Sequence, residues 1–214
     1  MTLRIIIADD QAMVCAGFRM ILSRESDIDV VGEAANGEEA VRLARELRPD
    51  VALVDIRMPV MDGLRVTELL AQDEPPTRVV IVTTFDDDET VYAAIGAGAS
   101  GIVLKDAEPQ FLVDAVRTAA GDGALISPSV AARLLRSAAG HPRRRAPAGP
   151  PDLPEREAAV VRAVARGLTN AEIADALGLS LSSVKAVLTE ARSRRGLRNR
   201  TELAIWAWES GLVD

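Results

Sequence analysis

Five side chains that could do chemistry together stand at the end of short apolar segments, or directly after them. They are Asp9, Asp10, Asp55, Thr83 and Lys105. If the apolar segments are strands of one parallel sheet, their carboxyl ends meet at one edge and bring these side chains together. Three carboxylates packed together repel one another, and a hard divalent cation relieves that repulsion. An all-oxygen site with few protein ligands suits Mg²⁺.

The chemistry predicted for this cluster is phosphoryl transfer. Asp10 and Asp55 would be side-chain ligands of Mg²⁺, Asp9 would act partly through water, and the backbone carbonyl of Arg57 could supply another oxygen. Asp55 would be the nucleophile that attacks phosphorus and becomes an acyl phosphate. The cation would neutralise the charge that develops on the phosphoryl oxygens.

Lys105 and Thr83 are predicted to contact the phosphoryl group. Only two of the 25 basic residues are lysines, so the ammonium at position 105 stands out in an arginine-rich chain. A compact charge on a flexible stem fits a tight site better than the planar fork of arginine does. Thr83 could donate its hydroxyl to the modified Asp55. The alternative is that these are ordinary polar residues at strand ends, which explains one or two of the positions but not five in one register.

The first 122 residues alternate between apolar and amphipathic stretches. The apolar segments lie at 3–8, 29–34, 51–54, 78–83 and 101–104. Stretches between them show helical periodicity, for example 37–48 and 111–121. Strands that alternate with helices favour β-α-β units. We therefore predict an α/β doubly wound, flavodoxin-like fold with a five-stranded parallel sheet in the order 2-1-3-4-5.

The rest of the chain is predicted to be a linker and a small all-α domain. Residues 137–154 are rich in Pro, Gly and Ala, which is typical of a linker. Four short helices are predicted at 154–166, 170–176, 181–195 and 200–210. Residues 169–172 form a capping-box pattern, and a Gly-containing turn at 178–180 makes a helix-turn-helix. The predicted domains are 1–122, a connecting helix and linker at 123–151, and a four-helix domain at 152–214.

The net charge of −7 is distributed unevenly. Residues 1–125 carry 11 basic and 23 acidic side chains, a net charge of −12, whereas residues 126–214 carry 14 basic and 9 acidic side chains, a net charge of +5. This split predicts that the second part faces a polyanion. The alternative is that charge simply drifts along the chain.

Other features bound the class of protein. The single cysteine, Cys15, excludes an internal disulfide, and the single histidine, His141, lies in the linker and removes most histidine-based catalysis and metal binding. No apolar run approaches the ~18 to 20 residues of a membrane span, and acidic residues come too soon for a signal peptide. We therefore predict a cytoplasmic protein.

The N-terminal half resembles the receiver domain of two-component response regulators. The matching stretches are IIIADDQ, DVALVDIRMPVMDG, VVIVTTFDDDE and AGASGIVLKD. The resemblance implies that a sensor histidine kinase phosphorylates Asp55, that Asp9 and Asp10 are the acidic metal pair, and that Thr83 and Lys105 are switch residues. Members of this family are not enzymes in the usual sense.

Two positions depart from the receiver pattern. Receivers usually carry Tyr or Phe three residues before the lysine, where this chain has Ile102. In the family this aromatic side chain moves inward when the threonine engages the phosphoryl group, and isoleucine has no polar tip for such a movement. Val60 replaces a glycine that is common after Met-Pro.

Residues 152–214 resemble the LuxR-type helix-turn-helix of NarL/FixJ response regulators. The matching stretches are LPEREAAVVRAVARGLTNAEIADALGLS, SVK and GLRNRTELAIWAWESGLV. The resemblance implies that the third helix enters the major groove of DNA, with its N-terminal residues at base edges. The candidate DNA contacts are Ser182, Ser183, Lys185, Ala186, Thr189, Arg192 and Arg194. Lysine can donate to guanine, and the arginines suit phosphates.

The third helix also departs from its relatives. Val187 replaces a common histidine, Glu190 stands at a position that is often basic, and Arg192 and Arg195 stand where apolar residues usually pack. We therefore predict weaker packing at this end of the helix. In the last helix, one tryptophan of the pair at 206 and 208 is predicted to fill the small core and the other to lie at a dimer contact, although both could belong to the core.

The predicted function is a DNA-binding transcriptional response regulator that is controlled by phosphorylation of Asp55, forms a homodimer when active and binds paired half-sites on DNA. One alternative, which Ile102 motivates, is an atypical regulator whose DNA binding is controlled without phosphorylation. Another is an aspartate-nucleophile phosphatase, but such enzymes usually show a D-x-D spacing, whereas Asp9 and Asp10 are adjacent.

Overall fold

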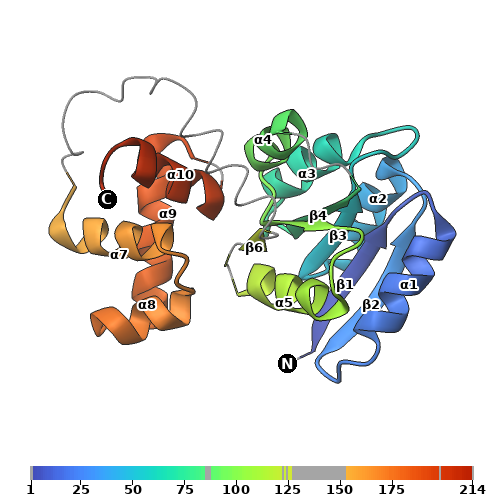
Figure 1. Ribbon diagram of the computed structural model, residues 1–214, viewed down its shortest axis with the longest axis horizontal. Helices are drawn as coiled ribbons and strands as arrows, with labels where there is room; N and C mark the ends of the chain where they lie inside the picture. Colours follow the sequence, from blue (N-terminus) through green and yellow to red (C-terminus); the bar gives the residue numbers. More distant parts are fainter. Residues whose placement is uncertain are drawn as a thin grey trace.

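The computed structural model describes residues 2–84, 88–121, 123, 125–126, 153–197 and 199–213. The elements of the N-terminal part are β1 (Leu3–Ala8), α1 (Ala12–Leu22), β2 (Ile28–Ala34), α2 (Gly37–Leu47), β3 (Val51–Asp55), α3 (Gly63–Gln72), β4 (Arg78–Thr83), α4 (Asp88–Ala97), β5 (Gly101–Leu104), α5 (Pro109–Ala120) and β6 (Leu125–Ile126). Four helices follow, α7 (Glu155–Ala165), α8 (Asn170–Leu177), α9 (Leu181–Arg195) and α10 (Arg200–Glu209), and Figure 1 shows them as a separate body beside the sheet.

The sheet is parallel, with the strand order β2-β1-β3-β4-β5-β6. The predicted order of the first five strands is confirmed, and their bounds lie within one residue of the predicted segments. The two-residue strand β6, which pairs with β5, was not predicted. A pair of residues is too short to show the period-2 alternation by which strands are recognised.

Two layers of helices cover the two faces of the sheet (Figure 1). Alternate residues of β1 explain the layering, because neighbouring side chains of a strand point to opposite faces. Ile5 and Ile7 pack in the core under α1 and α5, whereas Ile6 and Ala8 pack in the core under α2, α3 and α4. Strand β3 is buried along its whole length, as expected for a central strand of a parallel sheet.

The helix-turn-helix of the C-terminal part is confirmed. Thr169 begins α8 with a capping box, in which its hydroxyl accepts from the Glu172 backbone while the Glu172 carboxylate accepts from the Thr169 backbone. Gly178 ends this helix in the left-handed conformation, with φ at 63°. Helix α9 then begins at Ser180, whose side chain accepts from the Ser183 backbone.

The C-terminal end of α9 was predicted to pack weakly, but the structure shows that Arg195 is well packed. The Arg195 side chain is only 15% exposed, and its guanidinium lies 2.8 Å from a carboxylate oxygen of the buried Glu157 and 4.4 Å from the ring centroid of Trp206. An arginine at this position therefore packs through its stem and pairs its charge inside the domain.

The prediction that one tryptophan fills the small core is confirmed for Trp206, which packs against that core, whereas Trp208 is exposed.

Val60 adopts a backbone conformation that β-branched residues avoid. Its φ is 70°, and its side chain is 77% exposed. The left-handed region costs an L-residue ~1–2 kcal/mol, and glycine escapes this cost while losing ~0.5–1 kcal/mol through its greater freedom when unfolded. The conformation explains why a glycine is common at this position in receivers.

Replacing Val60 by glycine is therefore expected to raise the free energy of unfolding by roughly 0.5–1 kcal/mol. Urea unfolding of the wild type and the variant would measure the change. Val60→Ala is the matched control, since alanine keeps the left-handed strain and should gain less than glycine. A Val60→Gly variant less stable than the wild type would contradict the assignment of strain to this residue.

Among the described residues, no helix has both the length and the apolar character that crossing a membrane requires. The predicted connecting helix and linker at 123–151 lie almost wholly outside the described residues.

Candidate functional site

The three aspartates predicted to meet at one sheet edge do meet. Oxygen atoms of Asp9, Asp10 and Asp55 all lie within 4.8 Å of one another, with Asp9 and Asp55 buried and Asp10 exposed. Asp55 is the last residue of β3, and the adjacent pair directly follows β1. The backbone N–H of Gln11 donates to Asp9 Oδ1 at 3.0 Å, which fixes one oxygen of this carboxylate.

Lys105 joins this cluster as its ammonium. Its Nζ lies 2.5 Å from Asp9 Oδ2 and 3.3 Å from Asp55 Oδ2, and its side chain is only 10% exposed. Apart from this ion pair, Asp9 Oδ2 has no hydrogen-bond partner among the described residues. The backbone N–H of Lys105 donates to the Thr83 carbonyl at 2.9 Å, so the ends of β4 and β5 are tied together at the site.

The cluster carries an excess of negative charge, which favours the binding of a cation. Burial raises the pKa of Asp55, the Lys105 ammonium lowers it, Asp9 raises it, and the net result is a pKa above the ordinary value. Burial would lower the pKa of Lys105, but its contacts with Asp9 and Asp55 outweigh this and raise it. Two buried carboxylates share one ammonium, and a third carboxylate lies beside them.

The donor set fits Mg²⁺. Several carboxylate oxygens face one region at the sheet edge, Asp10 is open to water, and Asp9 Oδ2 is a buried oxygen with spare capacity to accept. Hard oxygen donors with access to water are the surroundings that Mg²⁺ prefers. Arg57, whose carbonyl was predicted to be a further ligand, follows Asp55 by two residues and has an exposed side chain.

Gly63 is a structural requirement of the site that the sequence reasoning missed. A Cβ atom at this position would lie 2.0 Å from the carbonyl oxygen of Asp55, and the Gly63 N–H donates to the Ile56 carbonyl at 2.9 Å. The turn after Asp55 therefore folds back tightly against the end of β3. The sequence marks a helix start here, since Asp62 before this glycine caps α3, but that local signal does not show how closely the turn approaches Asp55.

Ile102 lies inside the receiver and not at its surface. It is 2% exposed and shares one apolar cluster with Val91, Ala94 and Ile95 of α4. An aliphatic side chain packed in this way cannot alternate between buried and exposed positions. The packing of Ile102 against α4 is therefore one physical connection between the end of the sheet and this helix.

The predicted DNA-reading face of α9 is exposed. Val184, Leu188 and Ala191 are buried in the core of the small domain, and Lys185, Ala186 and Thr189 are exposed on the other face. The predicted contacts Ser182 and Ser183 are close to the Ser180 hydroxyl, at 3.0 and 2.8 Å between oxygens.

The arginines predicted to contact phosphates have partners within the domain. Arg194 pairs with both Glu157 and Glu190, so it lies in an internal ion-pair network. Arg192 is half-buried, and its Nε donates to the Leu188 carbonyl at 3.3 Å. Glu190, which was expected to repel phosphate, is thus neutralised by a neighbour one turn away.

The same face of α9 lies beside the receiver. A cavity of about 140 Å³ is lined by Lys185, Thr189 and Arg192 on α9 and by Arg78 at the start of β4. An adjoining cavity of about 330 Å³ continues between the two domains and adds Pro76 and Thr77 of the receiver to its wall. Side chains of the N-terminal domain therefore lie next to the predicted DNA-reading face of α9.

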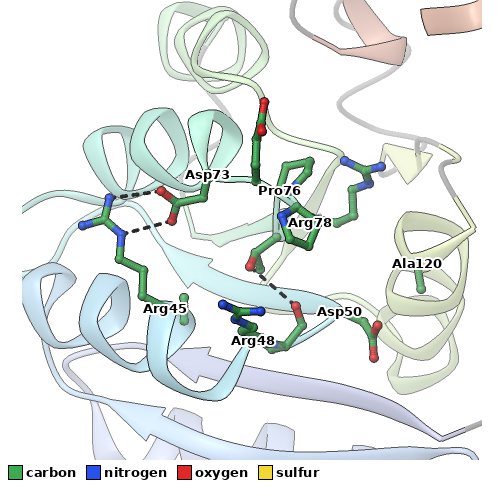
Figure 2. Close-up of a pocket in the computed structure, with 12 residues that line it drawn as sticks. Arg45, Arg48, Asp50, Asp73, Pro76, Arg78 and Ala120 are labelled. Atoms are coloured by element: carbon green, nitrogen blue, oxygen red, sulfur yellow. Dashed lines mark hydrogen bonds and ion pairs between the residues drawn. The ribbon is translucent and has the colours of Figure 1, made fainter.

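A further cavity of about 510 Å³ lies at the opposite, amino-terminal edge of the sheet (Figure 2). Among its charged groups, Arg45 and Asp73 form two hydrogen bonds of 3.1 and 3.2 Å, and Asp50 accepts from the Arg4 backbone at 2.8 Å. This cavity is remote from the aspartate cluster and holds no comparable set of groups.

Comparisons with known proteins agree with this architecture. The model of the response regulator receiver domain matches residues 5–117, and that of bacterial regulatory proteins of the luxR family matches residues 151–207. The chain is 35% identical to the uncharacterized transcriptional regulatory protein YxjL of Bacillus subtilis, over 99% of this chain and 98% of YxjL. It is 34% identical to the response regulator protein VraR of Staphylococcus aureus over the full length of both. A crystal structure of the response regulator ChrA of a heme-sensing two-component system is 34% identical, covers 99% of this chain and 98% of that one, and has a TM-score of 0.55.

A receiver fold with an acidic phosphoacceptor pocket, followed by a LuxR-type helix-turn-helix, defines a class of signalling protein. This chain belongs to the response regulators of the NarL/FixJ type. It is a phosphorylation-controlled, DNA-binding transcription regulator, and its class is not one of enzymes.

Proposed function

We propose that Asp55 is the phosphoacceptor and that a sensor histidine kinase is the donor. The observation that carries the proposal is the approach of Lys105 Nζ to both Asp9 and Asp55, at 2.5 and 3.3 Å, inside a buried site. A carboxylate oxygen of Asp55 forms the new bond to phosphorus as the donor's bond to phosphorus breaks. Lys105 then neutralises a phosphoryl oxygen, and Thr83 donates its hydroxyl to another.

Asp9, Asp10, Asp55 and the Arg57 carbonyl would hold Mg²⁺. When bound, the metal supplies charge neutralisation for the phosphoryl oxygens. The chain's own groups do the rest. Asp9 holds the Lys105 ammonium beside the acceptor, and the tight turn at Gly63 fixes the carbonyl of Asp55.

The output is DNA binding by a pair of copies on two half-sites. Lys185, Ala186 and Thr189 would face base edges, with Ser182, Ser183 and Arg192 close to them, while Arg194 has less support because it is paired within its domain. The cavity shared by Arg78 and α9 means that the receiver must move away before a duplex can enter. We assign the receiver to 1–122, the linker to 123–151 and the DNA-binding domain to 152–214, and we place the protein in the cytoplasm.

A second candidate input is favoured by one observation. Ile102 is buried at the position where receivers usually carry a mobile aromatic, so the usual side-chain rotation is absent. A regulator of this kind could be opened by a ligand, a partner protein or its own concentration. The two candidates differ in whether chemistry at Asp55 changes the surface of the protein.

Sedimentation of the full chain with Mg²⁺ and beryllium fluoride, a phosphoryl mimic for aspartate, distinguishes them. We expect the mimic to convert monomer to dimer in the wild type, and we expect no response when Mg²⁺ is omitted or when Asp55 is replaced by alanine. Binding of the mimic is checked separately by ¹⁹F NMR. A wild type that binds the mimic and stays monomeric would contradict phosphorylation-driven dimerisation and favour the second input.

A further inference from the structure

One side chain in this protein caps two helices that belong to different domains. Asn199 is the N-cap of α10, where its Oδ1 accepts from the Glu202 N–H at 2.7 Å. Its Nδ2 donates across the domain boundary to the carbonyl of Ile95 in α4, at 2.9 Å. The residue is only 7% exposed, so both hydrogen bonds are shielded from water.

The position of Ile95 makes this contact a helix cap as well. The last four carbonyls of a helix lack partners within the helix, and Ile95 lies in the last turn of α4. Its carbonyl accepts from the Gly98 N–H at 3.0 Å and uses its second lone pair for Asn199. The N-terminus of α10 thus meets the C-terminus of α4, so the partial positive end of one helix faces the partial negative end of the other.

An amide is the group that suits this junction. It offers an acceptor to the electropositive end of α10 and a donor to the electronegative end of α4. Aspartate caps an N-terminus as well as asparagine does, but it would place a negative charge against the carbonyl of Ile95. Serine would keep the cap on α10 but is too short to replace the bond across the boundary.

Apolar packing accompanies the polar contact. Ile205 of α10 packs against the receiver core that contains Val91, Ala94 and Ile95 of α4. The cavities that separate the recognition face of α9 from Arg78 lie beside this junction, and the larger one includes Asn199 in its lining. The junction of α4 and α10 therefore lies next to the region where α9 faces the receiver.

We infer that Asn199 is a positioning residue that holds the two domains closed, and that a shift of α4 releases it. This inference rests on the proposed function, because phosphorylation of Asp55 is what would shift α4. Ile95 and Ile102 share one buried cluster, so the carbonyl that Asn199 contacts moves with the packing beneath the switch site. A hydrogen bond of 2.9 Å is lost after a displacement of under 1 Å, which makes the contact sensitive to small helix movements.

The test compares full-length Asn199→Asp with the wild type, with and without Mg²⁺ and beryllium fluoride. Small-angle X-ray scattering reports whether the domains separate, and fluorescence anisotropy reports affinity for a random-sequence DNA duplex at low salt. Without the mimic, we expect Asn199→Asp to have a larger radius of gyration than the wild type. We also expect it to bind DNA about tenfold more tightly, because it has lost a hydrogen bond and gained a charge at the wrong helix end.

Matched variants separate the two roles of Asn199, which are to hold the domains closed (the latch) and to cap α10. Asn36 is the N-cap of α2 and accepts from the Glu39 N–H at 2.9 Å, so Asn36→Asp makes the same change inside the receiver and should leave both readouts unchanged. Asn199→Ser keeps a capping side chain without the added charge, and should open the protein as well. Thermal unfolding checks that each variant is folded. If the Asn199→Asp variant is unfolded, the Asn199→Ser variant decides the result.

The outcomes also separate this inference from the proposed function. If the mimic opens the wild type while both Asn199 variants stay closed without it, the latch is overturned and phosphorylation control stands. If the Asn199 variants open and the mimic has no effect, the latch is supported and phosphorylation control fails. Equal behaviour of Asn36→Asp and Asn199→Asp would also overturn the latch.

Discussion

Replacing Lys105 by alanine is expected to slow phosphorylation of Asp55 by about a hundredfold, the usual loss when one preorganised charge is removed from a site of group transfer. The Lys105 side chain is only 10% exposed and its Nζ lies 3.3 Å from the Asp55 carboxylate, so its ammonium meets the phosphoryl group in surroundings that screen it little. The rate is measured with acetyl phosphate, a small donor that bypasses kinase docking, and followed by intact-protein mass spectrometry.

The pH dependence gives this prediction a second readout. Phosphorylation requires the Asp55 carboxylate, and the pKa of Asp55 is raised by burial and by Asp9 but lowered by Lys105. The rate should therefore fall as pH drops through a pKa that is higher than the ordinary value. Loss of Lys105 removes the lowering influence, so the acid limb should move to higher pH in Lys105→Ala. The pKa of Lys105 itself is raised above its ordinary value, so its titration adds no limb near neutral pH.

Two variants serve as controls. Lys185→Ala removes the other lysine of the chain, which lies on α9, and should be phosphorylated at the wild-type rate. Lys105→Arg keeps the charge but brings a planar fork into the site, and should remain slow. Phosphorylation of Lys105→Ala at the wild-type rate, with an unchanged pH profile, would remove Lys105 from the proposed machinery.

Sequence patterns could locate the aspartate cluster because its geometry follows from topology. Once strands and helices alternate, parallel strands end at one edge, and Asp9, Asp55, Thr83 and Lys105 must converge there. The bounds of the strands were also predictable, because runs of buried β-branched residues mark central strands. What the pattern could not show was the close approach of Gly63 to Asp55, which depends on the three-dimensional path of the turn.

Contacts between distant segments were the least predictable. Arg195 was expected to weaken the packing of α9, but it pairs with Glu157, 38 residues away in the chain. The junction of Asn199 with Ile95 joins residues 104 positions apart, and only its N-cap half has a local signature, an asparagine three residues before Glu202. Local rules predict helix ends well, but they do not say which other helix end will lie against them.

The second large effect is expected in DNA reading, where replacing Lys185 by alanine should weaken binding to the operator by about 5- to 150-fold, which corresponds to about 1–3 kcal/mol. Other side chains on the reading face offer little to replace it. The Thr189 hydroxyl donates to the Lys185 carbonyl at 2.9 Å, Ala186 is apolar, and the Ser182 and Ser183 hydroxyls lie beside that of Ser180. Arg192, the other charged side chain near this face, is half-buried, and its Nε donates to the Leu188 carbonyl, whereas Lys185 is exposed. Lys185 is therefore the charged donor that we expect to reach guanine.

The operator for this measurement is selected from random duplexes by the wild type in the presence of beryllium fluoride. Lys185→Arg should bind it nearly as well as the wild type does, because arginine also donates to guanine O6 and N7. Arg156→Ala removes an exposed charge from the first turn of α7, away from the reading face, and should change little.

Random-sequence DNA separates the two possible roles of Lys185. If Lys185 reads bases, replacing it lowers affinity mainly for the operator. If Lys185 binds phosphate, replacing it lowers affinity equally for both duplexes and reduces the salt slope by about one. Equal losses on the two duplexes would therefore contradict base reading, and would assign sequence recognition to the apolar part of the face.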